Sequence, residues 1–155
     1  MSCSRDHFIH RGFTLIEVLM VVGLIAILVA IVLPKYEDYR YRIQVAQAVN
    51  DIVAMSAVIS QYQMNENALP TNLAAVGLDR QLDPWGTPYR YTDLTLNGSK
   101  GKARKDRKLN PLNSDFDLYS IGKDKESTTP LTPKVSHDDV LRANDGAFIG
   151  LGKDF

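Results

Sequence analysis

Residues 12–34 read GFTLIEVLMVVGLIAILVAIVLP, and this stretch decides the fold of the 155-residue chain. Between Val18 and Leu33 it contains no charged or strongly polar side chain. A helix from Phe13 to Leu33 would be about 30 Å long, which matches the hydrocarbon thickness of a bilayer. The stretch is therefore predicted to be a membrane-spanning helix.

One carboxylate interrupts the apolar stretch near its beginning. Glu17 would be costly to place in hydrocarbon unless a cation lies beside it. The alternative interpretation is an ordinary single-pass anchor with an incidental glutamate near the membrane interface. The residues themselves therefore predict only that Glu17 needs a cationic partner.

A short basic segment ends where the apolar run begins. Arg5 and Arg11 outnumber Asp6 in this segment, which favours a cytoplasmic location for it and a head outside the inner membrane. A secretory signal is cleaved after its hydrophobic region. Cleavage at the boundary after Gly12 would instead leave the membrane segment on the mature protein.

The motif GFTLIE at residues 12–17, followed by Pro34, resembles the prepilin-like proteins, which comprise type IV pilins and the pseudopilins of type II secretion. The resemblance implies cleavage between Gly12 and Phe13 by a dedicated aspartic peptidase, and methylation of the new amino terminus at Phe13. It also implies that Glu17 pairs with the Phe13 ammonium of a neighbouring subunit, because opposite charges attract strongly in low dielectric.

Three segments are expected: a leader over residues 1–12, a transmembrane and assembly helix over 13–34, and an amphipathic helix with a globular head over 35–155. Pro34 should kink or locally melt the helix rather than end it. Apolar side chains recur at mostly three- and four-residue steps as far as about Met64, so the same helix should continue. These positions are Tyr36, Tyr39, Ile43, Val45, Val49, Ile52, Met55, Ile59 and Tyr62.

The face from Ile43 onward is expected to pack on the head, but the membrane half has nothing within so short a chain to pack on. A helix that is apolar on all sides must contact lipid or other copies. Oligomerisation is therefore expected. The resemblance implies a homopolymer with related minor pilins, an inner-membrane assembly platform and the prepilin peptidase as partners.

The rest of the chain predicts a small head. A short helix is expected in residues 70–77, capped by Thr71 and closed by Gly77. Alternating side chains and turn residues predict three short strands, at residues 89–96, 116–122 and 147–151. The expected fold is therefore α+β: one long helix, half in the membrane and half amphipathic, packed on a small antiparallel sheet.

Two further features favour a pseudopilin. Residues 83–89 read DPWGTPY, a rigid turn in which Trp85 should fold over apolar surface. The segment resembles one in major pseudopilins, although a generic turn with a core tryptophan is the alternative. The only cysteine, Cys3, lies in the expected leader. The mature chain could then form no disulfide, whereas many type IV pilins staple a carboxy-terminal loop with one.

Acidic residues late in the chain are candidate calcium ligands. Calcium takes roughly six to eight oxygen ligands, which a few carboxylates, carbonyl groups and water could supply. The segment SIGKD at residues 120–124 resembles the start of the calcium loop of major pseudopilins. The resemblance implies a site made of the Ile121 carbonyl and the side chains of Asp124, Asp138 and Asp139. Exposed carboxylates without a ligand are the alternative.

The remaining composition bounds the function. There is no phosphate loop, paired-histidine zinc motif or nucleophile elbow, so catalysis is not expected. The formal net charge is zero, which gives no indication of nucleic-acid binding. The basic run from Lys100 to Lys108 could dock an acidic partner, but such a run without interleaved aromatic residues is typical of a solvated loop.

The resemblance to the prepilin-like proteins therefore implies a structural subunit of a type II secretion pseudopilus. Two alternatives remain. The first is a pilin of a type IV pilus that serves adhesion, motility or DNA uptake. The second is a membrane-tethered binding module that never polymerises.

Overall fold

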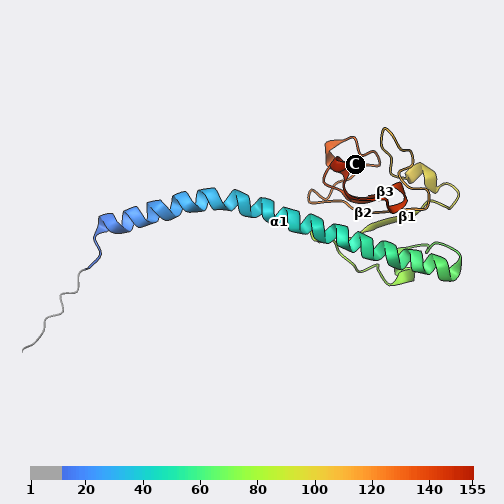
Figure 1. Ribbon diagram of the computed structural model, residues 1–155, viewed down its shortest axis with the longest axis horizontal. Helices are drawn as coiled ribbons and strands as arrows, with labels where there is room; N and C mark the ends of the chain where they lie inside the picture. The colour runs from blue at the N-terminus through green and yellow to red at the C-terminus, as the bar shows by residue number, and fades with distance from the viewer. Residues whose placement is uncertain (1–11) are drawn as a thin grey trace, which may run out of the picture. The chain divides into compact units, whose positions relative to one another are not determined.

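A computed structural model describes residues 12–155 (Figure 1). Nearly all of the expected leader, including Cys3, Arg5 and Arg11, therefore lies outside the described residues. The chain divides into two compact units, the first ending at Arg40 and the second spanning Tyr41–Phe155. A long helix and an antiparallel sheet make up the fold, which is α+β as predicted.

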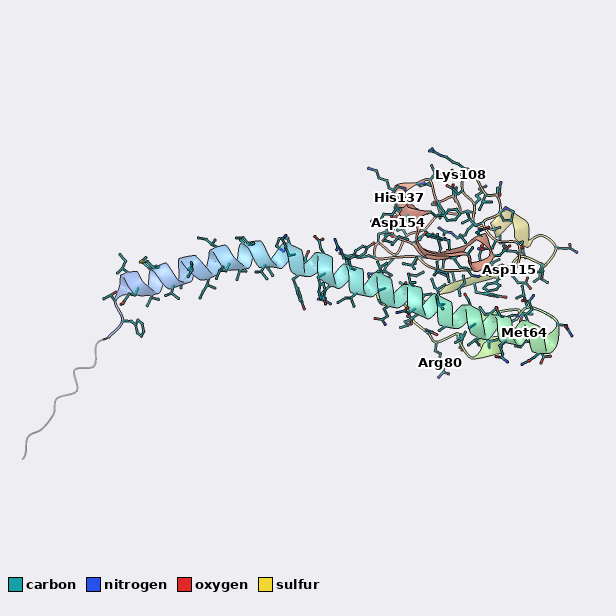
Figure 2. All side chains as sticks on the ribbon, viewed as in Figure 1. Met64, Arg80, Lys108, Asp115, His137 and Asp154 are labelled. Carbon is teal, nitrogen blue, oxygen red and sulfur yellow. The ribbon has the colours of Figure 1, made fainter. Side chains whose placement is uncertain are left out.

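Helix α1 (Leu15–Glu66) has 52 residues and does not end at Pro34, as predicted; the helix is continuous on both sides of this residue, so it does not melt locally there. In the first unit its side chains stand free on all sides (Figure 2). The large apolar side chains from Phe13 to Leu33 are 46–88% exposed. The helix is long and apolar enough to cross a membrane, with a mean hydropathy of 3.1 over its most apolar window. So much exposed apolar surface indicates contact with lipid or protein.

The second unit contains a four-stranded antiparallel sheet in the order β1-β2-β3-β4. Each strand pairs with the next strand in the sequence (Figure 1). The strands are β1 (Arg90–Asp93), β2 (Phe116–Ser120), β3 (Val140–Ala143) and β4 (Phe148–Leu151).

Strand β3 was not predicted from the sequence. All four of its side chains are buried, so it lacks the alternation of apolar and polar residues that marks a half-buried strand. The other three strands lie within the predicted ranges, although β1 is shorter than expected. The prediction of three strands is therefore corrected to four.

The core of the head lies between the second part of α1 and the sheet. The helix contributes Ala48, Ile52, Met55 and Ile59, which are buried and recur at three- and four-residue steps. They pack in one cluster with apolar side chains of all four strands, Tyr91, Phe116, Leu118, Val140, Ile149 and Leu151 among them. The predicted packing face is corrected at its start, because Ile43 is 48% exposed and Val45 is the first predicted position to join the cluster.

Two short segments lie between α1 and β1, and residues of both contribute to the core cluster. A 3₁₀-helix (Leu73–Val76) is closed by Gly77 in the left-handed region, as predicted, but Asn72 rather than Thr71 caps it, accepting the Ala75 N–H at 3.1 Å. Both residue types can cap helices, so neighbouring candidates are hard to separate from sequence.

The DPWGTPY turn is held by the buried Asp83. Its carboxylate accepts the N–H groups of Trp85 and Thr87, at 3.0 and 2.8 Å. It also accepts the hydroxyls of Thr87 and Ser120, both at 2.5 Å. Trp85 packs against the core cluster, as predicted. The turn is thereby fastened to the end of β2.

Removal of core volume should destabilise the head far more than the same change on the exposed side of α1. Ile52 is completely buried, so Ile52→Ala should lower the free energy of unfolding by about 2–5 kcal/mol. Val53→Ala is the matched control, because Val53 is 50% exposed. Denaturant titration of the full chain in detergent micelles, followed by Trp85 fluorescence, measures both. Equal losses would contradict this core.

Candidate functional site

The predicted processing site lies just before α1. Residues 12–14 have no regular secondary structure, and Phe13 is 88% exposed. A Cβ atom added to Gly12 would meet nothing within 4 Å. The Gly12–Phe13 peptide bond is therefore open to a peptidase, and no packing within the described residues depends on Gly12.

Glu17 takes part in a reciprocal cap at the start of α1. The N–H and hydroxyl of Thr14 donate to its Oε2 atom, at 2.9 and 2.8 Å, and the Glu17 N–H donates to the Thr14 hydroxyl at 3.3 Å. This is a capping box, whose signature is Thr-x-x-Glu ahead of an apolar run. This capping box was not predicted, although residues 14–17 carry its signature.

The capping box bears on the assembly role predicted for Glu17. Both hydrogen bonds that the carboxylate accepts come from Thr14, a neutral residue. They satisfy polar groups at the helix start, but they do not neutralise the charge. A carboxylate held in this way, beside an exposed apolar helix surface, still requires a cation when that surface is buried in lipid or protein.

The predicted calcium ligands come together only in part: Asp124 and Asp138 line one cavity, whereas the Asp139 carboxylate is directed to Arg104. Asp139 is fully buried, and its Oδ2 atom accepts from Arg104 Nη2 at 2.5 Å and from the Ser127 hydroxyl at 2.6 Å. The neighbouring Asp138 instead lies toward the surface. Its Oδ2 atom accepts the N–H groups of Lys123 and Asp124, at 2.7 and 3.0 Å. The two adjacent aspartates thus serve different parts of the head.

The other two predicted ligands lie in different surroundings. Asp124 is exposed, and its Oδ1 atom accepts the Glu126 N–H at 2.8 Å. Ile121 directly follows β2 and lines a separate cavity. Within residues 12–155, no group of three or more His, Cys, Asp or Glu side chains is placed to hold a metal ion. As they lie, Ile121, Asp124, Asp138 and Asp139 do not form one ligand set, because the Asp139 carboxylate binds Arg104 and the Asp138 carboxylate binds backbone N–H groups.

Asp124 and Asp138 line a cavity of about 500 Å³ at the surface of the second unit. Its other side chains are Tyr41, Lys123, Lys134, His137 and Lys153. Burial and the nearby aspartates raise the pKa of Tyr41 above its ordinary value, so its hydroxyl stays protonated. The basic side chains compensate the two carboxylates, which makes this a mixed-charge surface rather than an anionic one.

The basic run from Lys100 to Lys108 is not uniformly solvated. Lys105, Arg107 and Lys108 are exposed, and Figure 2 marks Lys108 at the outer edge of the head. Arg104 is buried, with only 3% of its side chain exposed. No local pattern predicts this burial, because the partners of Arg104, Ser127 and Asp139, lie 23 and 35 residues further along the chain.

A second buried arginine joins other parts of the head. Arg142 of β3 forms a two-pronged ion pair with Asp115, in which both N···O distances are 2.7 Å. Its guanidinium also lies 4.1 Å from the centre of the Phe116 ring. The Asn113 side chain connects this region to Asp117 and to the Arg142 carbonyl, at 2.8 and 2.9 Å. Charged side chains therefore cross-link the head where a disulfide cannot.

Comparison with known proteins identifies a motif at the start of the chain. Residues 9–33 match the family model described as the prokaryotic N-terminal methylation motif. No solved structure matches the chain significantly.

The chain is similar to proteins of two kinds. It is 32% identical to a fimbrial protein of Pseudomonas aeruginosa over 89% of this chain and 82% of that protein. It is 31% identical to the type II secretion system core protein G of the same species over 73% of this chain and 83% of that protein. The match to a fimbrial protein of Neisseria meningitidis, 33% identical, covers 48% of this chain and only 44% of that protein.

Proposed function

Since the chain belongs to the type IV pilin-like family, we propose that it is a structural subunit of a type II secretion pseudopilus. The main support for this proposal is the similarity to core protein G, which extends over most of both proteins. The absence of cysteine after residue 12 supports it, because the head then cannot form the disulfide that closes a carboxy-terminal loop in many type IV pilins. The subunit has a structural role and no catalytic one.

The proposal includes a maturation step that acts on residues 12–17. A prepilin peptidase cuts after Gly12, and the new amino group of Phe13 is methylated. The exposure of this bond and the match to the methylation motif support the step. The chain sits in the inner membrane through the first part of α1, with its head in the periplasm.

Assembly follows from the surface of α1. The mature helix leaves the membrane and packs with copies of itself, which covers its exposed apolar side chains. Glu17 pairs with the Phe13 ammonium of a neighbouring copy. Related minor pilins and an inner-membrane assembly platform are the other proposed partners.

A type IV pilus subunit is the second candidate function. It is favoured by the similarity to the Pseudomonas aeruginosa fimbrial protein. That match covers 82% of the fimbrial protein, and the match to core protein G covers 83% of core protein G. The two candidates share processing, membrane insertion and polymerisation. They differ in what the filament does, so only a cellular assay separates them.

Deletion of the gene is expected to stop secretion and leave surface pili intact. Proteins that normally leave the cell by type II secretion should accumulate in the periplasm, because no pseudopilus forms. Cell fractionation with assays of these proteins measures the first effect, and electron microscopy with motility and DNA-uptake assays measures the second. Loss of pili with normal secretion would assign the chain to a type IV pilus instead.

A further inference from the structure

Arg104 is the most enclosed cation among the described residues. Its Nη2 atom donates to Asp139 Oδ2 at 2.5 Å and its Nη1 atom to the Ser127 hydroxyl at 2.6 Å. The Ser127 hydroxyl in turn donates to the same Asp139 oxygen at 2.6 Å. The guanidinium carbon also lies 4.3 Å from the centre of the Tyr119 ring. The Arg104 side chain thus links Ser127 to Asp139 and packs on Tyr119 of β2.

The backbone of the same residue makes further cross-links. The Arg104 N–H donates to Asp117 Oδ2 of β2 at 2.7 Å, and its carbonyl accepts the Leu112 N–H at 2.8 Å. The next residue, Lys105, exchanges backbone hydrogen bonds with Thr129 and Leu131, at 3.2 and 3.0 Å. The segment around Arg104 therefore joins β2, the loop after it and the residues that lead into β3.

The resemblance to major pseudopilins implies that a calcium ion makes this cross-link, by binding the loop after β2 together with Asp138 and Asp139. A divalent cation at Asp139 would have to displace the guanidinium or lie beside it, and like charges at that range repel. The donor set also fits arginine better. Asp139 and Ser127 are one carboxylate and one hydroxyl, which a planar guanidinium can bridge, whereas calcium needs several oxygens around it.

We propose that Arg104 is the structural cation of this head. Its guanidinium makes the cross-link that a calcium ion would otherwise make, and the head is stable without divalent metal. The proposal goes beyond the proposed function and does not depend on it. It concerns how the head is held together, whether or not the chain polymerises.

The Arg104–Asp139 ion pair is buried, so each charge depends on the other for compensation. Burial raises the pKa of Asp139, while the Arg104 charge acts in the opposite direction and favours the carboxylate form. Arg104 Nε and Asp139 Oδ1 make no hydrogen bond within the described residues. Removal of one partner leaves the other buried and uncompensated, which destabilises more than removal of both.

Thermal unfolding of the full mature chain in detergent micelles tests the proposal. The melting temperature should be the same in excess calcium and in chelator. Arg104→Gln should lower it by roughly 10 °C or more, because it strands a buried carboxylate. Arg107→Gln is the matched control, since it removes an exposed arginine from the same run. It should leave the melting temperature unchanged.

A double variant keeps the test informative if Arg104→Gln fails to fold. Arg104→Gln with Asp139→Asn removes both charges and should recover part of the loss. A calcium-dependent rise in the melting temperature of the unmodified chain, abolished by Asp124→Ala or Asp138→Asn, would overturn the proposal. So would a loss in Arg104→Gln no larger than that in Arg107→Gln.

Discussion

Replacement of Glu17 by alanine is expected to abolish filament assembly while the chain still inserts into the membrane. Insertion depends on the apolar run that follows, which the substitution leaves intact. Assembly buries that run against neighbouring copies, and the proposed contact between the Glu17 carboxylate and the Phe13 ammonium is then made in low dielectric, where it is strong. Removal of the carboxylate leaves a buried ammonium without a partner.

The capping box offers a competing explanation, and two further variants separate it. Glu17→Gln keeps a side chain that can cap the Thr14 N–H but loses the charge. Thr14→Ala keeps the charge but removes the hydroxyl that donates to it. If charge pairing drives assembly, Glu17→Gln should fail like Glu17→Ala, and Thr14→Ala should still assemble. If capping alone matters, Glu17→Gln should assemble and Thr14→Ala should fail.

Membrane fractionation and electron microscopy of sheared or purified filaments measure insertion and assembly for each variant. Glu37→Ala is the matched control, because it removes a carboxylate from an exposed position further along α1. Normal filaments from Glu17→Ala would remove the pairing role from the proposal.

The parts of the fold that follow from local pattern were predictable. The apolar run predicts a membrane-length helix, and the three- and four-residue steps after Pro34 predict its continuation into the core. Pro34 did not end α1, since a proline costs one hydrogen bond and the turns on both sides remain intact. The capping box of Thr14 and Glu17 was equally local, and the sequence carried its signature.

The parts that depend on distant partners were not predictable. Strand β3 lies between β2 and β4 and all four of its side chains are buried, so its sequence does not alternate between apolar and polar residues. Arg104 looked like one of several solvated basic residues, and only the fold brings Asp139 to it. The calcium prediction placed Asp138 and Asp139 in one ligand set, but these adjacent residues, just before β3, direct their carboxylates to different partners.

Gly12→Val is expected to block maturation and, with it, assembly. The proposed peptidase must approach the backbone closely at the bond after Gly12, and a branched side chain there would obstruct it. The chain itself should be unaffected, because a Cβ atom at residue 12 meets nothing within 4 Å. The variant should therefore accumulate in the membrane as a folded precursor that retains residues 1–12.

The uncut precursor should also fail to polymerise for an electrostatic reason. Before cleavage the Phe13 nitrogen is part of a neutral amide, so it offers Glu17 of a neighbouring copy no positive charge. Gly101→Val is the matched control, since a Cβ atom there also meets nothing within 4 Å and the residue lies in the head. It should be cut and assembled normally. Mass spectrometry of the amino terminus measures the cut and the added methyl group. A Gly12→Val chain that begins at Phe13 would contradict the cleavage requirement, and filaments made of uncut chains would contradict the pairing.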